Sequence, residues 1–136
     1  MAALTEARLT PKRDGKTFAR PVAAGEVIYE GALSCLSATG FATPGATATT
    51  LTADGVAKST VDNSDGADGD LTVEVERIVS RFANSAGADE ITAAEIGDTA
   101  YIVDDQTVAK TDGTGTRSAA GEIVDVDAQG VWIKFG

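Results

Sequence analysis

Short stretches of alternating apolar and polar residues recur along this chain, and this pattern predicts β-strands. The clearest stretch covers residues 71–76, in which Leu71, Val73 and Val75 share one face while threonine and glutamate occupy the other. Beyond it the alternation changes phase. A β-bulge near residues 76–78 would account for the change, because one extra residue exchanges the two faces of a strand.

Other stretches have the same character. Strands are expected at residues 26–36, 56–61, 100–103, 107–110, 122–126 and 131–135. The last two should form a hairpin through the turn at residues 127–130. Residues 37–55 are rich in Ala, Thr and Gly and carry few large side chains, so we expect them to be irregular or weakly paired strand.

A single short helix is expected, at residues 91–97. Thr92 is a candidate N-cap, Glu95 stands three residues later as its capping-box partner, and Gly97 could end the turn. Many short strands with frequent Gly and Asp turns and almost no helix are typical of all-β domains. The sequence therefore predicts a mainly β fold, a small β-barrel or β-sandwich with one short helix.

The composition indicates a core that is small for the length of the chain. Of the 136 residues, 24 are alanine and only 29 are Leu, Ile, Val or Phe, and the formal net charge is −10. Few large apolar side chains and strong self-repulsion both weaken an isolated fold. Oligomerisation or docking on a partner would supply the missing stability, with a bound ion as a further option.

The charge is unevenly distributed. Residues 1–20 carry a net charge of +3 and the remaining residues a net charge of −13. We therefore expect an extended basic N-terminal arm at 1–20 and a β-rich binding domain at 21–136, with the arm lying against an acidic surface of a partner or of a neighbouring copy. A loose solvated tail is the alternative. The candidate contact residues are Arg8, Lys12, Arg13, Lys16 and Arg20.

Catalytic chemistry finds little support in the sequence. The chain has no histidine, which is the usual general base and the usual partner of a catalytic nucleophile, so a small hydrolase is remote. Cys35, the only cysteine, shares its strand parity with apolar residues and is expected to be a small buried side chain. An acidic body with few aromatic residues also disfavours nucleic acid, for which only the arm offers weak contacts. No signal peptide or membrane-spanning stretch is recognised.

One cluster of acidic residues could hold a metal ion. Asp62, Asp65, Asp68 and Asp70 fall within nine residues, and hard cations such as calcium prefer clustered carboxylate oxygens. The spacing does not fit an EF-hand, because Gly66 occupies the fifth position of a loop that begins at Asp62. A solvated loop is the favoured interpretation, with calcium as the alternative, and no metal ligand is assigned.

Two long segments carry a resemblance to a known family. Residues 21–36, PVAAGEVIYEGALSCL, and residues 73–135 resemble the bacteriophage head decoration proteins, also called capsid cement proteins. The most specific pieces are RFANS at 81–85, IGDTAYIVDDQTV at 96–108 and AGEIVDVDAQGVWIKF at 120–135. The order and spacing of these pieces carry the resemblance, which is weakest in residues 1–20 and 37–70.

The resemblance implies a structural virion protein. Such a protein is made in the host cytoplasm, binds the outer surface of an assembled capsid, usually as a homotrimer, and holds neighbouring major capsid subunits together. It implies no enzymatic activity and no cofactor, while the composition and hydropathy described above argue against nucleic acid and a membrane as partners. A host-surface or carbohydrate-binding module displayed on the virion is the alternative, and it would need an exposed aromatic platform, for which Tyr29, Tyr101 and Trp132 are the candidates.

Overall fold

The computed structural model describes residues 2–13 and 15–136. Its elements, in chain order, are β1 (Thr17–Pro21), β2 (Val27–Ile28), β3 (Leu33–Leu36), β4 (Ala42–Pro44), β5 (Thr52–Ala57), β6 (Val61–Asp62), β7 (Thr72–Glu76), β8 (Ser80–Asn84), the 3-10 turns η1 (Gly87–Asp89) and η2 (Ala93–Glu95), β9 (Thr99–Ile102), β10 (Thr107–Ala109), β11 (Ala119–Asp127) and β12 (Gly130–Lys134). The fold is mainly β, as the sequence predicts.

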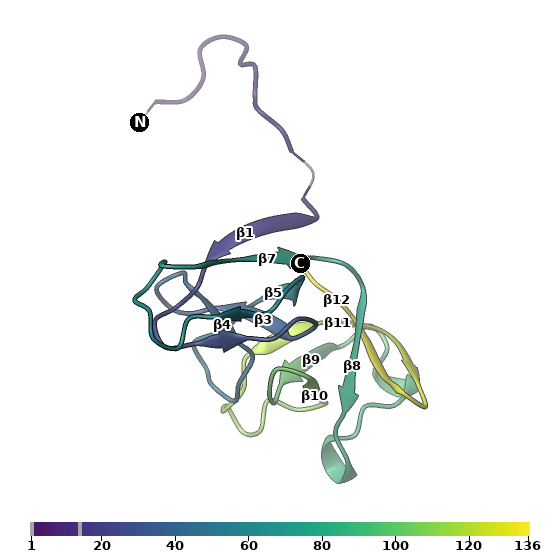
Figure 1. Ribbon diagram of the computed structural model, residues 1–136. Helices are drawn as coiled ribbons and strands as arrows, with labels where there is room; N and C mark the ends of the chain where they lie inside the picture. Colours follow the sequence, from purple (N-terminus) through teal and green to yellow (C-terminus); the bar gives the residue numbers. More distant parts are fainter. Residues whose placement is uncertain (1, 14) are drawn as a thin grey trace.

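The strands form two main layers that follow the order of the chain. Strands from the first half build an open sheet in the order β1-β7-β5-β3-β4, and β2 pairs with β6 beside it. Strands β8 to β12 close a small barrel in the order β10-β8-β12-β11-β9. In this barrel β10 pairs with β8 in parallel, and the antiparallel pairing of β10 with β9 closes the ring of strands. Figure 1 shows the sheet, in purple to teal, lying against the barrel, in green to yellow.

Two apolar clusters stabilise these layers. The larger one fills the barrel with residues such as Ile102, Ile123 and Ile133, and it includes Leu33 and Cys35 from the open sheet. Because this cluster contains side chains from both layers, the sheet and the barrel share a core. The smaller cluster lies on the other side of the open sheet; it consists of Val22, Ile28, Ala32, Ala42, Ala57, Val73 and Val75.

Cys35 has the buried position that the sequence predicts. Its side chain is fully inaccessible and lies within the larger cluster. Burial, together with the negative charge of nearby Asp54, raises the pKa of the Cys35 thiol to about 12. At neutral pH this side chain is therefore a neutral, packed thiol.

The expected bulge at residues 76–78 is wrong. Strand β7 ends at Glu76, and β8 begins at Ser80 in the barrel. The alternation changes phase because the chain leaves one layer and enters the other, each with its own buried face. Between the two strands, Ile78 and Val79 remain 45% and 44% exposed.

The expected helix at residues 91–97 is replaced by a single 3-10 turn, Ala93–Glu95. The capping box is present: Thr92 Oγ1 accepts from the Ala94 N–H, and Glu95 Oε1 accepts from the Thr92 N–H. Gly97 leads out of the turn with a φ of +97°, and its N–H donates to Ile123 O in the barrel. Thr92, which caps the start of the turn, and Gly97, which follows its end, are so close in sequence that only one turn fits between them.

The segment at residues 37–55 contributes more to the sheet than its composition predicts. It contains β4 and most of β5, and β5 lies between β3 and β7 near the centre of the sheet. Gly55 allows this position, because a Cβ on Gly55 would lie 2.5 Å from Glu76 O and because its φ is +157°. The small side chains of this segment thus permit close approach of β5 and β7.

Candidate interaction surface

The basic arm is shorter than the sequence indicates. Residues 2–13 and 15–16 are exposed and belong to no helix or strand, and they lead away from the body in Figure 1. Residues 17–21, most of which the charge pattern assigns to the arm, form β1 and pair along β7 from Thr17–Glu76 to Pro21–Thr72. The local sequence gives little sign of this strand, because Phe18 is its only large apolar residue and Arg20 continues the basic pattern of the arm. The body therefore begins at residue 17.

The candidate contact residues divide between arm and body. Arg8, Lys12, Arg13 and Lys16 lie on the arm and are exposed, whereas Arg20 lies within β1 and is half-buried. The arm also exposes Leu4 and Leu9, by 71% and 98%. Two exposed leucines beside several cations are typical of a binding segment, because burial of exposed leucine side chains against a partner is favourable in free energy.

Arg20 belongs to an ion-pair network at the root of the arm, by which we mean Lys16 and the residues of β1 that follow it. Its Nε donates to Asp54 Oδ2 at 2.7 Å and its Nη2 to Asp54 Oδ1 at 3.0 Å. Arg77 approaches the same carboxylate, with Nη2 2.8 Å from Oδ1, and its Nε donates to Asp54 O at 3.0 Å. Asp54 is fully buried, so two guanidinium groups hold a carboxylate that water does not reach.

The charges of this network favour ionised Asp54. Burial by itself raises the pKa of Asp54, but the hydrogen bonds and positive charges of Arg20 and Arg77 outweigh that effect and hold the pKa below its ordinary value of 3.8. The hydrogen bond to Asp54 likewise raises the pKa of Arg20. The network is thus fully charged at neutral pH and fixes β1 to the centre of the sheet.

Three guanidinium groups lie close to the Phe18 ring at this root. The Cζ atoms of Arg20, Arg77 and Arg13 lie 4.6, 4.7 and 5.2 Å from the centre of its ring. Arg13 is the last described residue of the arm before residue 15, so this contact orients the point where the arm leaves the body. One carboxylate, that of Asp54, lies among these three arginines, so this cluster carries a net positive charge on a strongly acidic chain.

The acidic loop uses most of its carboxylates to accept backbone N–H groups, two from the loop itself and one from the chain before β2. Asp62 accepts from the Ser64 N–H, Asp68 from the Ala24 N–H and Asp70 from the Ala67 N–H. Buried Asn63 donates to the carbonyls of Val22, Ala23 and Ala67 and so joins the loop to the chain before β2. Asp65 is exposed. Within the described ranges no group of three or more acidic, Cys or His side chains is placed to hold a metal.

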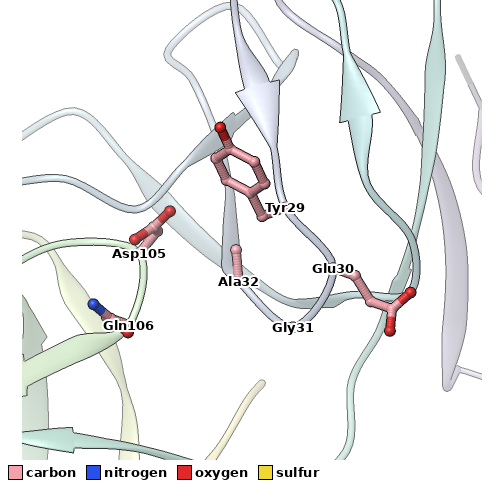
Figure 2. Close-up of a pocket in the computed structure, with 6 residues that line it drawn as sticks. All are labelled: Tyr29, Glu30, Gly31, Ala32, Asp105 and Gln106. Atoms are coloured by element: carbon pink, nitrogen blue, oxygen red, sulfur yellow. The ribbon is translucent and has the colours of Figure 1, made fainter.

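The three candidate aromatic residues differ in exposure. Tyr29 is 60% exposed and lines an open hollow of about 390 Å³ with Ala32, Asp105 and Gln106. In Figure 2 the ring of Tyr29 and the carboxylate of Asp105 lie on the same side of the hollow, while Glu30 lies on the opposite side of Gly31. Tyr101 and Trp132 are half-buried.

Trp132 already has partners on the barrel. The Cζ atom of Arg81 lies 5.6 Å from the centre of the Trp132 ring, and Trp132 Nε1 donates to Asp127 Oδ2 at 2.8 Å. Of the three aromatic residues, Tyr29 is therefore the most exposed and the most accessible to a ligand.

Comparisons of this chain with family models, with curated proteins and with solved structures found no match. Over the residues that the structure describes, none of the helical turns has the length and hydrophobicity needed to cross a bilayer.

Proposed function

We propose that this chain is a structural protein of a bacteriophage head, which binds the outer surface of the assembled capsid and holds neighbouring major capsid subunits together. The observation that carries the proposal is the exposed cationic arm with its fixed, positively charged root. The sequence resemblance at residues 21–36 and 73–135 supplies the identity of the partner.

An arm of this kind suits a partner that is assembled before the arm binds. The exposed leucines and cations of the arm contact little of their own body, so they can bind a surface formed by two adjacent subunits. Fixing an exposed arm on a partner costs conformational entropy, and the contacts must exceed this cost. Binding at many equivalent positions on a shell multiplies the effect of each modest contact.

The proposal includes a homotrimer. Few large apolar residues and the net charge of −10 weaken the isolated chain, and contact between copies would bury further surface. The proposed activity requires no catalytic step and no cofactor, because cementing a shell is a matter of binding free energy alone.

A deletion of residues 2–16 tests the role of the arm. This deletion leaves β1 and the Arg20–Asp54 pair in place, so the body should still fold. Occupancy on empty shells of the cognate major capsid protein, measured by co-sedimentation, should fall about tenfold or more. Undiminished occupancy would refute the arm as the main contact.

A charge variant provides the matched control. Substitution of Arg8, Lys12 and Arg13 by glutamine keeps the length of the arm and removes three charges. Binding should weaken less than in the deletion and lose much of its dependence on salt, because screening acts on exposed charges.

A carbohydrate-binding module displayed on a virion is the second candidate, and the exposed Tyr29 beside Asp105 and Gln106 favours it. An aromatic face with nearby carboxylate and amide groups can bind the apolar face and the hydroxyls of a sugar. A glycan array would test it: binding that disappears in Tyr29→Ala would support this function, and an array without binding would refute it.

A further inference from the structure

A second hollow lies close to the root of the arm. It has a volume of about 360 Å³ and lies where the end of β5, the end of β7 and the Glu30–Gly31 turn meet. Val56 and Ile78 provide its apolar surface, and Glu30, Glu76 and Lys58 provide its charges. Ile78 is 45% exposed although it is a large aliphatic residue. The lining of this hollow therefore combines apolar side chains with two carboxylates and one ammonium group, a net negative charge.

The arm has the complementary pattern. Leu9 is 98% exposed and follows Arg8, while Lys12 and Arg13 lie a few residues further on. An extended segment that places one leucine in an apolar hollow can bring adjacent cations to carboxylates at its rim. The sequence around Leu9 thus matches the hollow in both polarity and charge.

The position of the arm root indicates whether Leu9 reaches the hollow of its own molecule or that of another copy of the chain. Arg77 N donates to Lys16 O at 2.7 Å, which fixes the root beside Ile78, and from there the arm runs away from its own body (Figure 1). From Lys16 to Leu9 the extended chain spans at most about 25 Å, which is enough to reach an adjoining molecule.

We propose that this hollow receives the arm of a second copy of the chain, with Leu9 against Val56 and Ile78 and with Arg8 near Glu30 and Glu76. Each molecule then offers an arm and accepts one, and such head-to-tail contacts form a closed trimer when the rotation between neighbouring copies is threefold. The inference deepens the proposed trimer by naming a contact between copies, and it rests on that part of the proposed function. The contact uses Leu9 and Arg8 and requires no capsid, which leaves Leu4, Lys12 and Arg13 of the same arm for the capsid surface.

A peptide of residues 2–16 and a body that lacks them test this contact directly. Fluorescence anisotropy of the labelled peptide should show saturable binding to the body. Leu9→Ser in the peptide should weaken binding about tenfold or more, because a leucine side chain loses its burial. Thr10→Ser in the peptide is the control and should change the affinity less than about twofold.

The body has its own matched pair of variants. Ile78→Lys places a cation in the hollow and should abolish peptide binding. Val79→Lys alters a neighbour of nearly equal exposure that does not line the hollow, and it should leave binding unchanged. Both sites are exposed, so both variants should fold, and their melting temperatures verify this. Equal effects of the two variants, or no binding of the wild-type peptide, would overturn the proposal.

Sedimentation of the full chain distinguishes a second copy from the same copy. The full chain should form oligomers that dissociate on dilution and on Leu9→Ser. A full chain that stays monomeric while the free peptide binds would show that the arm folds back on its own body, and the proposed exchange would be wrong. Because neither measurement uses a capsid, failure of shell binding is recognised separately.

Discussion

Arg20 donates two hydrogen bonds to Asp54, at 2.7 and 3.0 Å, and the two residues lie on strands that are not adjacent in the sheet. Arg20 lies on β1 and Asp54 on β5, and β7 lies between these strands in the sheet. The ion pair therefore ties the outer strand, from which the arm emerges, to the interior of the sheet. A pull on the arm is resisted at Asp54 and along the β1–β7 hydrogen bonds.

Asp54→Asn should destabilise the body by about 2 kcal/mol, because Arg20 and Arg77 lose their ionic partner while they stay near the surface, where water partly replaces it. Urea unfolding measures the loss. Asp65→Asn, which removes an exposed carboxylate from the acidic loop, is the control and should change stability by less than about 0.5 kcal/mol. Equal stability of Asp54→Asn and wild type would contradict a structural role for the pair.

The stability difference between the wild type and the Asp54→Asn variant should depend on pH. The folded state lowers the pKa of Asp54 below its ordinary value of 3.8, so the contribution of the carboxylate is present above about pH 4 and is lost as the pH falls through the folded-state pKa. Unfolding free energies of the two proteins should differ by a constant amount from about pH 5 to 7 and converge below about pH 4. A difference that grows on acidification would have the wrong sign.

Cys35 should resist alkylation in the folded protein. Its thiol is buried and its raised pKa, about 12, leaves almost no thiolate at neutral pH. Iodoacetamide should therefore label it only through unfolding, and Asp54→Asn, if it costs about 2 kcal/mol, should speed labelling about 30-fold. Fast labelling of the wild-type chain without denaturant would show that the larger cluster opens locally.

Calcium should bind weakly or not at all to the loop at residues 62–70. Asp62, Asp68 and Asp70 each accept a backbone N–H, and buried Asn63 fixes the loop in that arrangement. These hydrogen bonds hold the carboxylates in positions where, among the described residues, no three acidic side chains converge on one point, so calcium would require the loop to rearrange. Calorimetric titration should record no heat of binding and no shift in melting temperature. A saturable heat that Asp68→Asn removes would restore the calcium hypothesis.

Most strands of the second half of the fold could be predicted from the sequence, because they are short runs of strand-forming residues bounded by Gly and Asp turns. Residues 100–103, 107–110 and 122–126 fall on β9, β10 and β11, and the final hairpin turns where the sequence places it. Parallel pairing of β10 with β8 could not be predicted, since it depends on how the barrel closes.

The first half was harder to predict because its side chains are small or charged. Nothing in the local sequence marks Asp54, which lies between Ala53 and Gly55, as the buried partner of two arginines. Likewise Arg20 resembles the other cations of the arm until the pairing of β1 with β7 is known. Both facts arise from contacts between distant segments, which hydrophobic periodicity does not encode.

The most direct test of the capsid-cementing account is the thermal stability of empty cognate shells with and without saturating amounts of this protein. The account predicts that the protein binds in a fixed number of copies per capsomer and raises the temperature at which the shells fall apart. A chain that remains a very stable monomer, leaves the shells uncovered and does not alter their disruption temperature would contradict it.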